Sequence, residues 1–393
     1  MSDKSNVSPS SGIARLSFNE KFRLQTWLMG IIAFAVVLFL LVQARFILIA
    51  LAIAIILFSL TSDAINSISR LRIGQFRIAN WLASIVAVIL IASGLLTLAG
   101  LVISQINTVL TTTLSYTDDA QRAVAQMFSW MGEDVEQSVL QTVRTIEVSG
   151  YLRSAAGQAG TILSQVVLII LFVGFLFLER VWFGTKLETL MGDKAQARRV
   201  SAIIGSIIRR VNRYLLVKAL ISSATGVAVF LLLSVFDIQF AVAMGLLTFV
   251  LNFIPSVGSI IATLIVTLVA YIQTPEPQTA VLIFVLTGMI QFILGNVIDP
   301  MLMGKTLRLS AFGIIISLAF WGAVWGVPGM FLAVPFMVAV MIVCSHIPAA
   351  RPVAILLSRE GLPEEEFPLM QDPHTPLPEG NADRSYGHAV GAE

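Results

Sequence analysis

The sequence predicts an all-α membrane protein, a polytopic bundle of transmembrane helices with two helical hairpins and an external helical segment. Of its 393 residues, 57% are hydrophobic and only 12% are charged, about half the charged share of an ordinary globular chain. The mean hydropathy is +0.88. The apolar residues also gather in runs of roughly 15 to 24, enough for helices rising 1.5 Å per residue to cross a hydrocarbon core of about 30 Å.

The basic residues predict how these runs are oriented. If the N-terminus is cytoplasmic, alternation of the runs leaves 21 of the 25 Lys and Arg residues on the cytoplasmic side. Cytoplasmic loops are enriched in Lys and Arg, so we expect both termini in the cytoplasm. The runs lie at 27–43, 46–60, 81–103, 161–178, 219–235, 240–254, 256–273, 280–298, 311–326 and 327–344.

Residues 1–26 are predicted to be a cytoplasmic leader, and 27–103 to form the first three transmembrane helices. Lys21 and Arg23 precede the first run as they would in a signal peptide, but no small-residue cleavage site follows. We therefore interpret this run as a retained anchor. The tail 358–393 carries eight acidic residues and five prolines, a composition that predicts disorder.

Residues 104–160 are predicted to form the external helical segment. Apolar residues recur there every three or four positions, which is one face of a helix. We expect this face to pack against the segment itself, a neighbouring subunit or the membrane surface. The residues of the face are Val124, Phe128, Met131, Val135, Val139, Val143 and Ile146.

Residues 161–357 are predicted to be the transmembrane core, which begins with one span and a basic amphipathic helix at 193–218. Basic residues alternate there with apolar ones, a pattern suited to the anionic cytoplasmic leaflet. Because they adjoin a span, topological anchoring accounts for them, and no nucleic-acid partner is expected. The basic residues are Lys194, Arg198, Arg199, Arg209, Arg210, Arg213 and Lys218.

Two long apolar stretches, 240–273 and 311–344, are predicted to be helical hairpins. Proline and glycine interrupt the first stretch at 252–258 and the second at 325–329. Proline lacks the backbone donor and disfavours helix in the residue before it, so with glycine nearby it ends or turns a helix. Whether the hairpins are re-entrant or fully spanning stays open.

Motifs of catalysis are absent from the sequence. It contains no His-Glu-x-x-His, Gly-x-Ser-x-Gly, P-loop or Gly-x-Gly-x-x-Gly pattern. Cys344 is the one cysteine, and three histidines leave no Cys/His zinc framework. We therefore expect no enzyme activity, cofactor or metal site.

The candidate binding residues are the polar and helix-breaking ones at membrane depth, where transporters place their sites. They form two clusters, one at the first hairpin turn and one around 291–300, which could shape a gate or a vestibule. In the alternative interpretation they are helix caps, helix ends and interfacial charges. Asp237, in a short external connection, could collect a cation or simply form a turn. The clusters comprise Asn252, Pro255 and Gly258 in the first, and Gln291, Asn296, Asp299 and Pro300 in the second.

Three motifs, in order, resemble the autoinducer-2 exporter family of bacterial permeases. They are Asn252-Phe-Ile-Pro-Ser-Val-Gly258, Asn296-Val-Ile-Asp-Pro-Met-Leu-Met-Gly-Lys305 and Gly326-Val-Pro-Gly-Met-Phe-Leu-Ala-Val-Pro335. The resemblance covers roughly residues 20–357. The family commonly reads Asn-Phe-Ile-Pro-Tyr-Ile-Gly-Pro at the first motif, whereas this chain has Ser256 and Ser259, so the geometry of its turn is open.

The resemblance implies secondary transport of a small solute across the bacterial inner membrane, with export of autoinducer-2 as the namesake activity. It also implies a homo-oligomer, a pentamer being one candidate assembly. Autoinducer-2 is uncharged and rich in hydroxyl groups, so neutral donors and acceptors could bind it. Those considered are Asn252, Ser256, Ser259, Gln291 and Asn296.

Two other functions are kept as alternatives. Sodium-proton antiport, attributed to some relatives, needs a titrating carboxylate, and Asp299 is the nearest candidate, with Asp237 as a second ion-coupling candidate. A membrane scaffold or regulator would instead bind partners through the external segment and the acidic tail. A scaffold needs no broken helices at membrane depth, so substitutions of Asn252 and Asp299 discriminate between these hypotheses.

Overall fold

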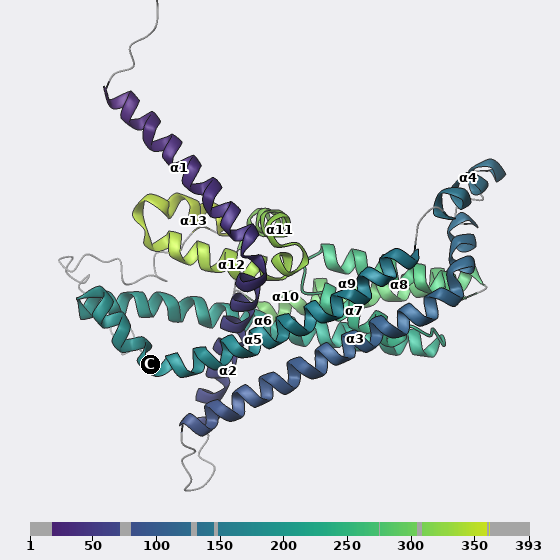
Figure 1. Ribbon diagram of the computed structural model, residues 1–393, viewed down its shortest axis with the longest axis horizontal. Coiled ribbons are helices and arrows are strands. Elements are labelled where there is room, and N and C mark those ends of the chain that lie inside the picture. The colour runs from purple at the N-terminus through teal and green to yellow at the C-terminus, as the bar shows by residue number, and fades with distance from the viewer. Residues whose placement is uncertain are drawn as a thin grey trace, which may run out of the picture.

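The computed structural model is a bundle of α-helices (Figure 1). It describes residues 18–70, 80–126, 132–144, 148–274, 276–304, 309–359 and 361. Within these ranges there is no strand, and seven helices are long and apolar enough to cross a membrane. The predicted helical membrane fold is thus confirmed. Most of the leader 1–26 and of the tail 358–393 lies outside the described residues.

The N-terminal helices are α1 (Phe18–Gln43), α2 (Arg45–Arg70) and α3 (Asn80–Gln126). Helix α1 projects away from the rest of the bundle (Figure 1). Helices α2 and α3 pack instead on α5 (Val148–Met191). Small side chains let these helices approach closely. The buried residues of this contact are Ala50, Ala54, Ala87, Ile169, Val173 and Phe177.

Within the predicted external segment 104–160, most of the described residues are helical. Helix α3 runs on to Gln126, the short helix α4 occupies Glu133–Arg144, and α5 begins at Val148. Residues 104–126 contain neither glycine nor proline, so nothing in the sequence ends α3 at the predicted boundary. The segment therefore consists mainly of the extended ends of two long helices. Of its apolar face, Phe128, Met131 and Ile146 lie outside the described residues.

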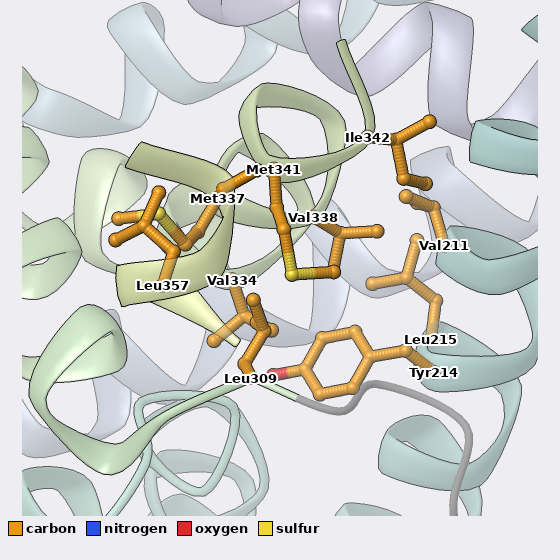
Figure 2. Close-up of a cluster of buried hydrophobic side chains, with 11 residues drawn as sticks. Val211, Tyr214, Leu215, Leu309, Val334, Met337, Val338, Met341, Ile342 and Leu357 are labelled. Carbon is orange, nitrogen blue, oxygen red and sulfur yellow. The ribbon is translucent and has the colours of Figure 1, made fainter. Parts of the chain in front are cut away.

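The predicted amphipathic helix 193–218 is the first part of one 42-residue helix, α6 (Lys194–Val235). Asp193 caps its start by accepting a hydrogen bond of 2.9 Å from the Ala195 amide. Val211, Tyr214 and Leu215 of α6 pack against α12 and α13 in a buried cluster (Figure 2). Part of the apolar face of the predicted amphipathic helix thus packs inside the bundle.

The first predicted hairpin consists of α7 (Ala241–Leu251) and α8 (Val257–Gln273), and the break between them is confirmed. At 1.5 Å per residue, α7 extends only about 16 Å, roughly half of a hydrocarbon core. This length favours a re-entrant segment for α7. Helix α9 (Pro277–Phe292) follows and continues through the π-helical segment η2 (Ile293–Ile298) into α10 (Asp299–Met303).

The second predicted hairpin is also confirmed, as α11 (Ala311–Trp325) and α12 (Val327–His346). Gly326 turns the chain at φ 66° and ψ −143°, a conformation that only glycine adopts readily. The short helices η3 (Pro348–Ala350) and α13 (Arg351–Leu357) end the described core. Helix α13 is held at the start of α11, where the Ser310 amide donates to the Leu357 carbonyl at 2.8 Å.

Candidate functional site

A line of buried polar side chains runs along α6. Tyr214, Lys218, Ser222 and Thr225, here called the α6 polar stripe, follow one another at spacings of four, four and three. Residues three or four apart share one face of a helix. All four are buried, Ser222 and Thr225 completely. A helix apolar enough to cross a membrane therefore carries a polar face directed into the protein.

The turn of the first hairpin meets this stripe. The Asn252 carboxamide, at the end of α7, donates to the Ser222 hydroxyl at 3.2 Å and to the Thr225 hydroxyl at 3.5 Å. The Thr225 hydroxyl in turn donates to the Ile221 carbonyl at 2.7 Å. Asn252 is only 6% exposed, so the contact is shielded from solvent. Low local polarity strengthens such hydrogen bonds.

Local sequence fixes the shape of this turn. Pro255 lies in the turn between α7 and α8, and the Val257 amide donates back to the Pro255 carbonyl at 2.6 Å across Ser256. Ser256 has φ 60° and ψ −48°, the rare γ-turn with positive φ. Gly258 then passes so close to Leu251 that a Cβ would lie 1.8 Å from the Leu251 carbonyl oxygen. No residue with a side chain fits there without moving the backbone.

Two glycines set the distance between α6 and α7. A Cβ on Gly226 would lie 2.7 Å from the Gly245 carbonyl oxygen, and a Cβ on Gly245 would lie 2.8 Å from that of Gly226. The two backbones are therefore in direct contact. Gly226 follows Thr225 in the stripe, and Gly245 lies two turns before Asn252. This close approach brings the carboxamide within reach of the hydroxyls.

An ion pair lies on the α6 polar stripe one turn before Ser222. The Lys218 ammonium Nζ lies 3.0 Å from Asp299 Oδ2, and the side chains are 7% and 17% exposed. Asp299 stands where the π-helical segment η2 ends and Pro300 begins the next helical turn. The second carboxylate oxygen, Oδ1, is buried and has no hydrogen-bond partner among the residues that the structure describes.

Several other buried polar atoms near these helices have no hydrogen-bond partner within the described chain. They include Thr248 Oγ1, one turn before Asn252, and Tyr214 Oη on the stripe. Helix α9, which packs on α6 and α8, adds Thr287 Oγ1 and Gln291 Nε2. Leaving such a group unpaired costs about 1–3 kcal/mol. The interior thus offers neutral donors and acceptors, beside one neutralised ion pair, that a polar solute could satisfy.

The predicted candidates fall into three groups. Asn252 and Asp299 contact the α6 polar stripe, and Gln291 is buried on α9. Pro255, Gly258 and Pro300 shape the turns without offering a polar side chain.

The remaining candidates are exposed or are occupied by local contacts. Ser256 and Asn296 are exposed, so the expectation that both would bind solute beside Asn252 finds no geometric support. The Ser259 hydroxyl donates to the Ser256 carbonyl at 2.9 Å. Asp237 is an exposed turn residue with φ 55°, which matches the turn interpretation.

The α6 polar stripe was not among the binding surfaces predicted from the sequence. Lys218 was counted as the last residue of a basic surface helix, and Ser222 and Thr225 went unremarked inside an apolar run. The available signal was their shared helical face: four polar residues at spacings of four, four and three in a helix that otherwise becomes increasingly apolar. What they face could be found only from the fold.

Comparison with known proteins decides the family. Residues 28–349 match the sequence profile of the AI-2E family transporter. The chain belongs to the AI-2E family of transporters. The match includes both hairpins, the whole α6 polar stripe and the Lys218–Asp299 pair.

Curated relatives of this AI-2E transporter include the AI-2 transport protein TqsA of Escherichia coli K12. It is 33% identical over 211 residues, which are 51% of this chain and 57% of TqsA. A transport protein of Borreliella burgdorferi is 31% identical over 57% of this chain and 62% of its own length. A transport protein of Haemophilus influenzae is 29% identical over 72% of this chain and 83% of its own length. The first two relatives are thus matched over about three fifths of their length.

Proposed function

We propose that this AI-2E transporter carries a small, neutral, polar solute across the bacterial inner membrane, and that the solute is autoinducer-2. The observation that carries the proposal is the contact of Asn252 with the α6 polar stripe. Carboxamide and hydroxyl groups bind an uncharged, hydroxyl-rich molecule without a buried net charge. The similarity to TqsA, which is named for AI-2 transport, supports the choice of solute.

In this proposal, the break between α7 and α8 allows the tip of the hairpin to move. Asn252 holds the tip of the short α7–α8 hairpin to α6 by two hydrogen bonds of 3.2 and 3.5 Å. A solute hydroxyl that takes over these bonds would release the tip from α6. Discontinuous helices at membrane depth serve this purpose in secondary transporters. Binding and opening are then coupled through one side chain.

Uptake of labelled autoinducer-2 into proteoliposomes tests the proposal. We expect protein-dependent flux that Asn252→Ala lowers about tenfold, because removing one partner of a buried hydrogen bond costs on the order of 1–2 kcal/mol. Asn296→Ala is the matched control, since Asn296 carries the same carboxamide on an exposed surface. Unchanged flux in Asn252→Ala, or an equal loss in Asn296→Ala, would contradict the assignment of the site.

Sodium-proton antiport is the second candidate, and the Lys218–Asp299 pair favours it. Asp299 offers one paired and one unpaired carboxylate oxygen in a buried position. A carboxylate that exchanges its lysine partner for a sodium ion or a proton would couple the two fluxes. A sodium gradient would then change the internal pH of proteoliposomes, and Asp299→Asn would abolish the change. No pH change in the wild-type protein removes this candidate.

We also propose cytoplasmic termini and a homo-oligomer, the pentamer being the candidate assembly. The asymmetry of Lys and Arg supports the orientation, and the span Gln25–Gln43 of α1, in which no residue is fully buried, leaves an apolar face for a neighbouring subunit. In a Cys344→Ser background, Arg199→Cys should label from the cytoplasm and Glu276→Cys from the periplasm. Native mass spectrometry should give multiples of the 42.6 kDa chain, and a single-chain mass would contradict the oligomer.

A further inference from the structure

A second feature of the bundle lies apart from the α6 polar stripe. A pocket of about 1000 Å³ opens between α2, α3 and α5. Its size is at the upper end of the roughly 300–1000 Å³ usual for small-molecule sites. None of its lining residues belongs to α6, α7 or α9, so it is distinct from the proposed solute site. Its occupant must be inferred from its own lining.

The lining changes in character from one end to the other. Toward the interior it is apolar, with Val88 of α3 and Leu171 and Phe175 of α5. At the other end lie Ser84, four residues into α3, and Arg180 of α5. Among the lining residues, Ser84 and Arg180 are the two with polar side chains. A molecule that fits must therefore be apolar along its length and polar at one end.

The position of the pocket within the transmembrane spans indicates which molecules surround it and can enter it. Its walls belong to Leu82–Val109 and Ala159–Met191, two segments apolar enough to cross a membrane. The molecules at this depth are lipid chains. The polar end, near the start of α3, leads toward the membrane surface, where headgroups lie. The pocket thus has the same polarity and direction as a phospholipid.

Charge favours an anionic headgroup. Arg180 presents a planar guanidinium that matches phosphate oxygens. Lys186 of α5 is paired with Glu179, but Lys194, Arg198 and Arg199 lie in the first turns of α6. Basic residues beside a span attract anionic lipids by about 1 kcal/mol each near the surface. A zwitterionic headgroup would bring no net charge to this end of the pocket.

We propose that the α2–α3–α5 pocket binds one anionic phospholipid, with its phosphate at Arg180 and an acyl chain along Leu171 and Phe175. Gly174 lies in the lining, and a Cβ at this position would meet no atom within 4 Å. The open space beside Gly174 can accommodate the acyl chain of the lipid. The lipid would join α2, α3 and α5.

Native mass spectrometry of the full chain, with phosphatidylglycerol or phosphatidylcholine added in detergent, tests the proposal. We expect one tightly bound phosphatidylglycerol and at least tenfold weaker binding of phosphatidylcholine. Gly174→Leu should abolish the tight site by filling it. Arg180→Gln should weaken it about tenfold, as expected for a lost charge-assisted hydrogen bond, and Arg180→Lys should restore part of the affinity.

Matched controls separate the site from general effects. Gly184→Leu places the same side chain at another open position of α5 outside the pocket, and should bind phosphatidylglycerol as the wild type does. Arg198→Gln removes an exposed charge outside the lining and should have less than a twofold effect.

Three results would overturn the proposal. The first is unchanged binding in Gly174→Leu, provided that it elutes and unfolds like Gly184→Leu. The second is an equal loss of binding in Arg198→Gln and Arg180→Gln. The third is a change of oligomer mass in Gly174→Leu without loss of lipid, which would assign the pocket to a second copy of the chain.

Discussion

Lys218 of α6 and Asp299 of α10 form an ion pair of 3.0 Å although they lie 81 residues apart in the sequence. With the side chains only 7% and 17% exposed, neither charge is well solvated. Removing one partner of a buried pair leaves the other charge uncompensated, at a cost of about 3–5 kcal/mol. The pair therefore governs whether α10 stays on α6.

This pair predicts a strongly non-additive double-mutant cycle. Lys218→Met and Asp299→Asn should each lower the thermal unfolding midpoint markedly, whereas the double variant should recover most of the loss because no lone charge remains. The exposed pair Lys186–Glu179 is the control, and its cycle should give less than ~1 kcal/mol. Additive losses in the double variant would show that the two charges do not depend on each other.

The γ-turn at Ser256 predicts opposite effects of two substitutions. Strained backbone of this kind costs about 1–3 kcal/mol, and glycine removes the strain, whereas a β-branched residue increases it. Ser256→Gly should therefore unfold at the same or a higher temperature than the wild type, and Ser256→Val at a lower one. Asp237, with φ 55°, gives a second test. Asp237→Gly should likewise not destabilise the protein, and it should leave transport unchanged. A Ser256→Val protein as stable as Ser256→Gly would refute the turn.

The contact between Gly226 and Gly245 predicts that adding a single methyl group at either position would move the first hairpin away from α6. Gly226→Ala would place Cβ 2.7 Å from the Gly245 carbonyl oxygen, so the helices must move apart and Asn252 loses its reach to Ser222. We expect lower stability by about 1–3 kcal/mol, together with reduced solute flux. Gly288→Ala on α9, where a Cβ meets nothing within 4 Å, should leave both unchanged. Wild-type flux in Gly226→Ala would argue against a tight α6–α7 contact.

The helix breaks could be predicted from the sequence because their causes are local. Pro255 and Gly258 interrupt one apolar stretch, and Gly326 and Pro328 interrupt the other. Proline and glycine act on the backbone of their immediate neighbours whatever the rest of the fold. The two hairpins were therefore predictable, as was the choice of Asn252 beside the first break.

The pairing of side chains could not be predicted, because it depends on residues far apart in the chain. Lys218 looked like an interfacial anchor, since a single sequence shows a charge but not the carboxylate opposite it. Ser256 and Asn296 resemble Asn252 as polar residues near a helix break, yet they are exposed, whereas Asn252 is buried and donates to Ser222 of α6. Hydrophobic periodicity also fails here, because membrane helices are apolar on all sides and their buried face carries little contrast.

A side-chain hydrogen bond joins α1 to the second hairpin, and this bond gives the last prediction. The Trp325 indole Nε1 donates to the Leu41 carbonyl at 3.0 Å. Leu41 lies in the last turn of α1, where carbonyls lack partners within the helix. Trp325→Phe keeps an aromatic ring against Trp321 and Phe336 but removes this bond, so stability should fall by about 1 kcal/mol.

Hydrogen-deuterium exchange locates that loss. In Trp325→Phe, amides of the last two turns of α1 should exchange several-fold faster, because the hydrogen bond from the hairpin no longer holds the C-terminal end of the helix. Trp321→Phe is the matched control, since Trp321 contributes ring contacts to the same aromatic cluster and should leave exchange in α1 unchanged. Equal acceleration in both variants would mean that the aromatic packing, and not the bond to Leu41, fixes α1 to the bundle.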